Sequence, residues 1–207
     1  MRIVPFALLL SAGLGLAACS TPEADAPSDL VLVASGSPAK PDLPPARWDH
    51  KPQAEVWTTT ALSALDSHAS PLVDITPADI ETWCPGYATA SEEDRKAFWV
   101  GLISTLAKHE STWRPGVSGG EGRWHGLLQI SPATARGYGC DATSAEALKS
   151  GTANLSCGLR IMSTTVARDG VVSAGGGGVA ADWGPFNQPK KRSDMIAWTR
   201  AQGYCAG

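Results

Sequence analysis

The sequence SEEDRKAFWVGLISTLAKHESTWRPGVSGGEGRWHGLLQI, residues 91–130, decides the fold. Ser91, followed three positions later by Asp94, forms a capping box and predicts the start of a helix. Beyond this box, apolar side chains recur at spacings of three and four, at Phe98, Trp99, Leu102, Ile103 and Leu106. This spacing predicts a helix that turns one apolar stripe toward a core.

The stripe, continued four positions past Leu106, reaches a carboxylate, Glu110, where a leucine would be expected. Burial of an unpaired carboxylate is costly, so such a group keeps its proton or lies at the edge of a cleft. Either situation suits a general acid. Two plainer interpretations are a helix that frays before Glu110, leaving it solvated, and a pair between Glu110 and Arg114.

Three motifs follow one another along the chain: Glu110-Ser111, the segment GLLQISPATA at residues 126–135, and Asn154-Leu155 with Gly158. Their order resembles that of the SLT-type lytic transglycosylases, relatives of goose-type lysozyme, over roughly residues 75–205. The resemblance implies a mainly α, lysozyme-like helical domain with a catalytic cleft. Signals for β-strands are nearly absent from the sequence, in agreement with this fold class.

The resemblance also implies an activity on peptidoglycan glycan strands, without a metal or other cofactor. Glu110 takes the position of the family's general acid, which protonates the bond between N-acetylmuramic acid and N-acetylglucosamine. It then acts as base while the muramoyl C6 hydroxyl closes a 1,6-anhydro ring. Ser111, Gln129 and Asn154 match motif positions around the site. Three tryptophans in predicted loops offer flat faces for stacking on sugar rings, namely Trp113, Trp124 and Trp183.

One segment departs from the family pattern. The family usually ends its site with a sequence like Ala-Tyr-Asn-Ala-Gly, whose tyrosine orients the catalytic glutamate, whereas residues 180–185 read AADWGP. Three possibilities are open: Asp182 or Trp183 takes over this contact, another loop supplies it, or the activity is weak. Asp182 and Glu121 also leave open a hydrolytic muramidase, in which a second carboxylate activates water. A third interpretation is a lipoprotein that binds glycan strands without cutting them.

The N-terminus predicts export and lipidation. Arg2 precedes an apolar run that ends in Leu16 and small residues before Cys19, so residues 1–18 are expected to be a lipoprotein signal peptide. This arrangement resembles a lipobox, which implies lipid on Cys19, and Ser20 is typical of lipoproteins on the periplasmic face of the outer membrane. Residues 19–52, rich in Pro and Ala, are expected to be a disordered tether. Residues 53–207 are then the catalytic domain.

The cysteine count agrees with the predicted export. Without Cys19, four cysteines remain, and two disulfides are expected. Of the three possible pairings we favour Cys84 with Cys205 and Cys140 with Cys157. A four-thiolate zinc site is disfavoured because no C-x-x-C pair occurs. With 17 basic and 20 acidic residues, the mildly acidic chain gives no sign of nucleic-acid binding.

The remaining pattern predicts short helices separated by turns. They are expected at residues 53–65, from Thr76 to Cys84, at residues 131–137, around residues 144–149, from Thr152 to Asp169, and at residues 193–202. Residues 171–188 break the helical pattern with four consecutive glycines. This segment is expected to be a mobile loop over a cleft or a slack connection.

Overall fold

The computed structural model describes residues 42–206. The predicted signal peptide at residues 1–18, the lipidated Cys19 and the tether as far as residue 41 lie outside the described residues. Within residues 42–206, no helix is both long enough and apolar enough to cross a membrane.

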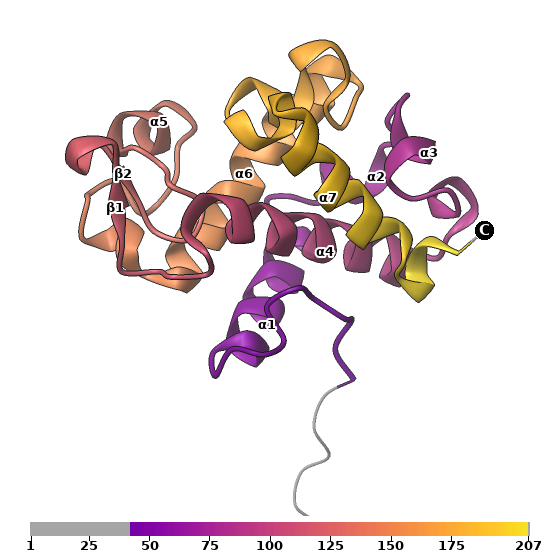
Figure 1. Ribbon diagram of the computed structural model, residues 1–207, viewed down its shortest axis with the longest axis horizontal. Helices are drawn as coiled ribbons and strands as arrows, with labels where there is room; N and C mark the ends of the chain where they lie inside the picture. The colour runs from indigo at the N-terminus through magenta and orange to yellow at the C-terminus, as the bar shows by residue number, and fades with distance from the viewer. Residues whose placement is uncertain (1–41, 207) are drawn as a thin grey trace, which may run out of the picture. The chain divides into compact units, whose positions relative to one another are not determined.

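A long central helix, α4 (Glu92–Ser111), organises the domain (Figure 1). Its start is as predicted, since the Ser91 hydroxyl accepts a hydrogen bond from the Asp94 amide at 3.1 Å. The predicted apolar stripe is buried, but so are Val100, Gly101 and Thr105 on other faces. The prediction of a single buried stripe was therefore too narrow, because helices pack around α4 from several sides.

The helices that surround α4 are α1 (Ala54–Leu65), α2 (Pro71–Asp74), α6 (Gly151–Asp169) and α7 (Pro189–Arg200). Figure 1 shows α1 and α7 on opposite sides of α4, with α6 crossing behind it. The shorter helices α3 (Ile80–Trp83) and α5 (Pro132–Gly137) lie at the periphery. In the described part, strand structure is limited to a hairpin of β1 (Ser118–Gly119) and β2 (Trp124–His125), in which Ser118 pairs with His125.

Several helix boundaries differ from the predicted ones. Ser131 caps α5 as expected, and Gly170 ends α6 in the left-handed conformation with φ 68°. However, α6 is capped by Ser150 rather than opened by Thr152, and α3 begins after Asp79 rather than after Thr76. Helix α7 starts four residues earlier than predicted, with Pro189 in its first turn, a position that suits proline.

The prediction of a disordered tether is wrong for its last residues, because residues 42–52 belong to the folded domain. Trp48 is fully buried, and its indole N–H donates to the Thr58 hydroxyl at 2.9 Å on α1. The rings of Trp48 and Trp57 lie 5.7 Å apart in an edge-to-face arrangement. The Pro-rich composition predicted disorder, but a tryptophan buried against α1 provides enough apolar contact to order the segment.

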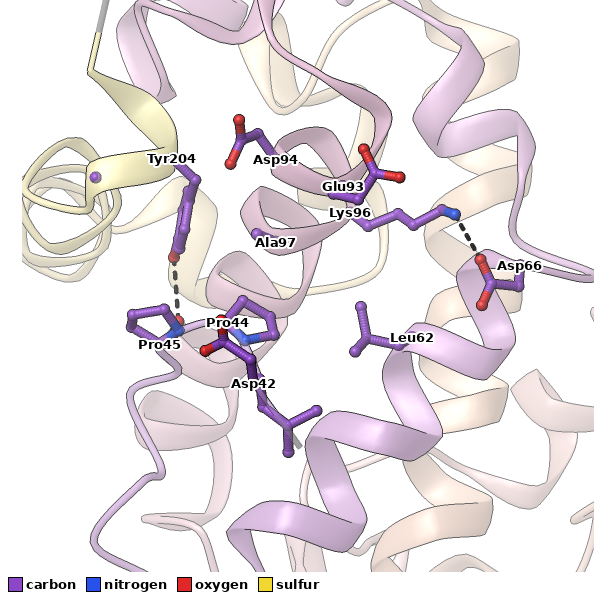
Figure 2. A pocket seen from close by; sticks show the side chains of 12 residues that line it. Asp42, Pro44, Pro45, Leu62, Asp66, Glu93, Asp94, Lys96, Ala97 and Tyr204 are labelled. Atoms are coloured by element: carbon purple, nitrogen blue, oxygen red, sulfur yellow. Dashed lines mark hydrogen bonds and ion pairs between the residues drawn. The ribbon is translucent and has the colours of Figure 1, made fainter. Parts of the chain in front are cut away.

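A cavity of about 560 Å³ lies where this segment meets α1 and the first turns of α4 (Figure 2). Leu62, Pro44 and Ala97 contribute apolar walls, and the Tyr204 hydroxyl donates to the Pro45 carbonyl at 3.4 Å. Lys96 at its rim is paired with Asp66 at 2.6 Å. This cavity is separate from the one that contains Glu110.

The glycine-rich segment 171–188 is ordered rather than slack. It forms three short 3₁₀ turns, η4 (Ala174–Gly176), η5 (Gly178–Ala181) and η6 (Gly184–Asn187). The Asp79 carboxylate accepts hydrogen bonds from three successive backbone amides, those of residues 172–174. The segment also buries Val179, Trp183 and Phe186 in the core. Two carboxylates, Asp79 and Asp169, thus fix a backbone that its composition alone would leave loose.

Both predicted disulfides are present. Cys84 is bonded to Cys205, and Cys140 to Cys157. The first ties α3 to the C-terminal turn, across 121 positions of sequence. The second ties the segment that follows α5 to the first half of α6.

Candidate active site

Glu110 lies in the last turn of α4, where the chain leaves the helix abruptly. Thr112 and Trp113 both adopt φ 55°, and their amides donate to the carbonyls of Lys108 and Ala107 at 3.1 and 3.2 Å. Such left-handed residues close a helix, and they are uncommon outside glycine. The helix therefore ends directly after Ser111, which leaves Glu110 at the edge of the packed core.

The Glu110 side chain lines a cavity of about 460 Å³. The cavity lies between the end of α4, the β1–β2 hairpin, the η5–η6 turns and the start of α7. Its lining residues are His109, Glu110, Gly119, Gly120, Trp124, Gln129, Asp182, Trp183, Gly184, Pro185, Gln188 and Lys191.

Burial raises the pKa of the Glu110 carboxyl to about 7, and the nearby positive charge of Lys191 opposes this shift only in part. Among residues 42–206, no side chain forms an ion pair or a hydrogen bond with the Glu110 carboxylate within the usual distances. The carboxyl is consequently half protonated near neutral pH. A group in this state can donate a proton and then accept one.

A second carboxylate nearby, Asp194 on α7, has the opposite environment. Arg47 binds it through two nitrogens at 2.7 and 2.9 Å, Lys108 lies 3.2 Å away, and His109 lies 2.7 Å away. These partners hold the pKa of Asp194 far below its ordinary value. Burial lowers the pKa of His109 although Asp194 opposes this. The cluster joins the segment before α1, the end of α4 and α7.

The hairpin supplies an aromatic wall. Trp124 is 42% exposed and lines the cavity, and the Arg123 guanidinium lies 4.8 Å from its ring centroid. The ring packs directly over Gly120, whose φ is 55°, so that a Cβ there would collide with it. Gln129, also in a left-handed conformation with φ 51°, donates its side-chain N–H to the Gly126 carbonyl at 2.9 Å. A ring held in this way is suited to stacking on a sugar.

The opposite wall carries Asp182 and Trp183. Trp183 is buried, and its indole N–H donates to the Leu128 carbonyl at 2.9 Å, so only part of it reaches the cavity. Asp182 is exposed and accepts a hydrogen bond from the Tyr138 hydroxyl at 2.9 Å. Tyr138 thus contacts Asp182 and not Glu110.

Three of the predicted substrate-binding residues do not line the cavity. Ser111 is buried and donates to the Leu127 carbonyl at 2.8 Å. Asn154 is buried in α6, accepts from the Leu128 amide at 2.9 Å and donates to the His125 carbonyl at 3.0 Å. Both therefore fix the loop that follows β2.

Trp113 is the third. Its indole N–H donates to the Ser104 carbonyl at 2.9 Å, and its ring lies 4.6 Å from that of His50. Trp113 packs against the segment that precedes α1, away from the cavity lining. By contrast, the fold brings four of the predicted site residues together in the lining of one cavity, namely Glu110, Gln129, Trp124 and Trp183.

Lys191, Gln188 and His109 line the cavity but were not singled out from the sequence. Pro189 was the sequence signal that could have pointed to Gln188 and Lys191, because it marks the start of α7 and brings Lys191 into the first turn of this helix. Within residues 42–206, no three His, Cys, Asp or Glu side chains gather as a metal site would require.

Comparison with known proteins agrees with this geometry. Residues 88–177 match the family model described as the Transglycosylase SLT domain. Solved structures of Bd0314 DslA, one of wild-type form 2 and two of glutamate-to-glutamine mutants, are 29% identical to the chain. They superimpose with TM-scores of 0.71 to 0.72, over 78 to 79% of this chain and 97 to 98% of theirs. No curated protein matches. The domain has the mainly helical, lysozyme-like fold that the sequence predicted.

Proposed function

We propose that the protein is a peptidoglycan lytic transglycosylase with Glu110 as its acid and base. The observation that carries this proposal is the Glu110 carboxyl in the cleft of an SLT-like domain, with its pKa raised to about 7 and no cation bound to it. Protonating a glycosidic oxygen needs a carboxylic acid that keeps its proton near neutral pH.

In the proposed reaction, the Glu110 carboxyl first donates its proton to the oxygen between N-acetylmuramic acid and N-acetylglucosamine. The bond from this oxygen to the muramoyl anomeric carbon then breaks. The resulting Glu110 carboxylate removes the proton of the muramoyl C6 hydroxyl, whose oxygen bonds to the same carbon. The products are an N-acetylglucosamine hydroxyl end and a 1,6-anhydromuramoyl end, no water is consumed, and Glu110 regains its proton.

The walls of the cleft fit a glycan strand. The exposed face of Trp124 and the side chain of Gln129 lie beside Glu110 in the cavity lining. A flat ring and an amide suit the apolar face and the hydroxyl and acetamido groups of amino sugars. We propose these two as the substrate-binding residues, with Trp183 as partial wall and Ser111 and Asn154 as supports of the loop.

A hydrolytic muramidase is the second candidate, and one carboxylate in the cleft favours it. Asp182 lines the same cavity as Glu110 and is oriented by Tyr138. Glu121, exposed with φ 58°, follows the lining residue Gly120. The two DslA mutants carry their replacements at positions 143 and 154 of that protein, eleven residues apart, which is also the separation of Glu110 and Glu121. A second carboxylate at either position would direct water to the anomeric carbon.

Mass spectrometry of soluble products from peptidoglycan separates the candidates. The transglycosylase predicts anhydromuropeptides from the wild-type chain, none from Glu110→Gln, and unchanged products from Asp182→Asn and Glu121→Gln. Reducing-end products heavier by one water, and lost in Asp182→Asn or Glu121→Gln, would instead establish hydrolysis. A protein that sediments with peptidoglycan but releases nothing would be a binding protein only.

We also propose that the chain is a lipoprotein of the outer membrane, anchored at Cys19 on the periplasmic face. The support is the sequence of residues 1–20 alone, with its basic start, apolar run and small residues before Cys19. Two or more acyl chains hold a protein stably on a bilayer. The wild-type chain should fractionate with outer membranes, whereas Cys19→Ala should not. Equal fractionation of both would contradict the proposal.

A further inference from the structure

Lys191 is a lysine in the cleft without a partner of its own. It lies in the first turn of α7, half-buried, and lines the cavity together with Glu110. Among the described residues, Lys96, Lys108 and Lys149 each lie within 4 Å of a carboxylate. Three other lysines have no such partner, namely Lys51, Lys190 and Lys191, and of these three Lys191 lines the cavity. A cation kept inside a cleft and left unpaired is suited to an anion that arrives from outside.

The place of Lys191 is fixed by the neighbouring cluster. Asp194 lies one helical turn further along α7, and Arg47, Lys108 and His109 bind its carboxylate. Residues three apart on a helix share a face, so the hold on Asp194 also sets the register of Lys191 against the end of α4. Asp194, the one carboxylate on this face of α7, is therefore already bound by three other side chains and is not a partner for Lys191.

Lys191 does not serve as an ion-pair partner of Glu110 either. If Lys191 served to keep Glu110 ionised, its charge would bring the pKa of Glu110 down to the ordinary range or below. Burial is the larger influence, and the pKa of Glu110 stays near 7. The other carboxylate in the lining, Asp182, is bonded to Tyr138. Lys191 therefore lines the cleft without an ion-pair partner among the described residues.

A glycan strand of peptidoglycan offers anions at one kind of place only. Its amino sugars are neutral, and its carboxylates are carried by the lactyl ether of the muramoyl residue or by the peptide attached there. We propose that Lys191 binds a carboxylate on the muramoyl substituent, and that this contact makes the cleft prefer acidic strands over neutral chitin-like ones. This inference rests on the proposed function, because it assumes a peptidoglycan strand in the cleft.

Binding to three glycans of equal length tests the inference. They are a strand fragment with peptide stems, the same fragment after removal of the stems, which exposes the lactyl carboxylate, and a neutral chitin oligosaccharide. The full chain carrying Glu110→Gln is used, so that no glycan is cut. To it are added Lys191→Met, Lys191→Arg, or Lys190→Met as the matched control, since Lys190 is exposed on α7 and does not line the cavity.

Lys191→Met is expected to weaken binding of acidic fragments roughly fivefold, the size of a partly exposed ion pair, and to leave the chitin oligosaccharide unchanged. Lys191→Arg should restore most of the loss, Lys190→Met should cause none, and the loss should shrink at high salt. A loss confined to fragments with stems assigns the carboxylate to the peptide, and a loss with stem-free fragments assigns it to the lactyl group.

Equal effects of Lys191→Met on neutral and acidic glycans, or no effect on either, would overturn the inference. Product analysis of the chains with intact Glu110 separates this failure from failure of the proposed function. If the wild-type chain releases products and Lys191→Met keeps the same preference between strands, the inference alone falls. If the wild-type chain releases no products, the proposed function falls and the inference with it.

Discussion

Two carboxylates close to the end of α4 show how neighbouring groups decide what an acidic side chain does. Asp194 is held by Arg47, Lys108 and His109, and its pKa lies far below the ordinary value. Glu110 follows His109 directly in sequence, has no such partner, and has its pKa raised to about 7 by burial. The first carboxylate is a permanent anion that joins three segments, whereas the second can exchange a proton at neutral pH.

The largest expected effect is the loss of catalysis when the exchangeable proton is removed. Glu110→Gln should lower product release from peptidoglycan by about 10³-fold, within the range of a lost general acid and base. Glu93→Gln, which changes an exposed glutamate in the first turn of the same helix, should leave it unchanged. Rates are measured from soluble muropeptides over time. More than a tenth of the wild-type rate in Glu110→Gln would remove Glu110 from this role.

The same substitution should stabilise the fold, in a manner that depends on pH. The folded pKa of Glu110, about 7, exceeds its ordinary value of 4.5, so the folded state binds more protons between these values. The contribution of Glu110 to the stability of the wild-type chain therefore falls as pH rises from 4.5 through 7. Glu110→Gln should gain about 2–3 kcal/mol relative to wild type at pH 8 and nothing at pH 4.

Urea unfolding at the two pH values measures this difference. A gain of equal size at both would mean that Glu110 is not buried as a titrating group. Together with the loss of catalysis, a gain at pH 8 would show a site that function maintains at a cost in stability.

Asp194→Asn should lower the free energy of unfolding, whereas Glu110→Gln should raise it. Asp194→Asn leaves the charges of Arg47 and Lys108 facing an amide, and because the Asp194 side chain is 36% exposed the loss is expected to be about 1–2 kcal/mol rather than that of a fully buried pair. In the wild-type chain, the lowered pKa means that this contribution is lost as pH falls below the ordinary value of 3.8.

Asp66→Asn is the matched control for this change, because Lys96 keeps Glu92 as a second partner. It should cost no more than about 0.5 kcal/mol by thermal or urea unfolding. Equal losses from the two substitutions would contradict a special role for the Asp194 cluster.

The smallest effect is expected at Asp182, the third carboxylate of this region. Tyr138→Phe removes its hydrogen-bond donor. If Asp182 takes no part in catalysis, the yield of anhydromuropeptides should change by no more than about fivefold, or about 1 kcal/mol. A much larger loss, or a switch in product type, would assign Asp182 a part in the chemistry.

Much of the framework could be predicted from the sequence, because the signals are local. The capping box at Ser91 and the apolar spacing that follows predict α4, and the same spacing places Glu110 at its end. Glu110, Gln129, Trp124 and Trp183 do meet in one cavity. The even number of cysteines after Cys19 predicted two disulfides, and the pairing that we favoured is the one in the structure.

The remaining features depend on contacts between distant residues. The order of segment 171–188 comes from Asp79, which lies more than 90 positions away in sequence. Residues 42–52 have a composition typical of linkers, but they are folded because the Trp48 side chain packs against α1. Ser111 and Asn154 lie in segments that resemble lytic transglycosylase motifs, yet their side chains bond to the backbone of the loop at residues 125–128, which no local pattern reveals.

The most direct test of the central claim, that Glu110 holds an exchangeable proton for glycan cleavage, is a carboxyl ¹³C titration of Glu110 in the free protein, recorded beside the pH dependence of kcat/KM for strand cleavage. Both should show one transition near pH 7, with cleavage falling above it as the acid loses its proton. A Glu110 carboxyl that titrates near 4.5, or cleavage that is indifferent to pH between 5.5 and 8.5, would contradict the account.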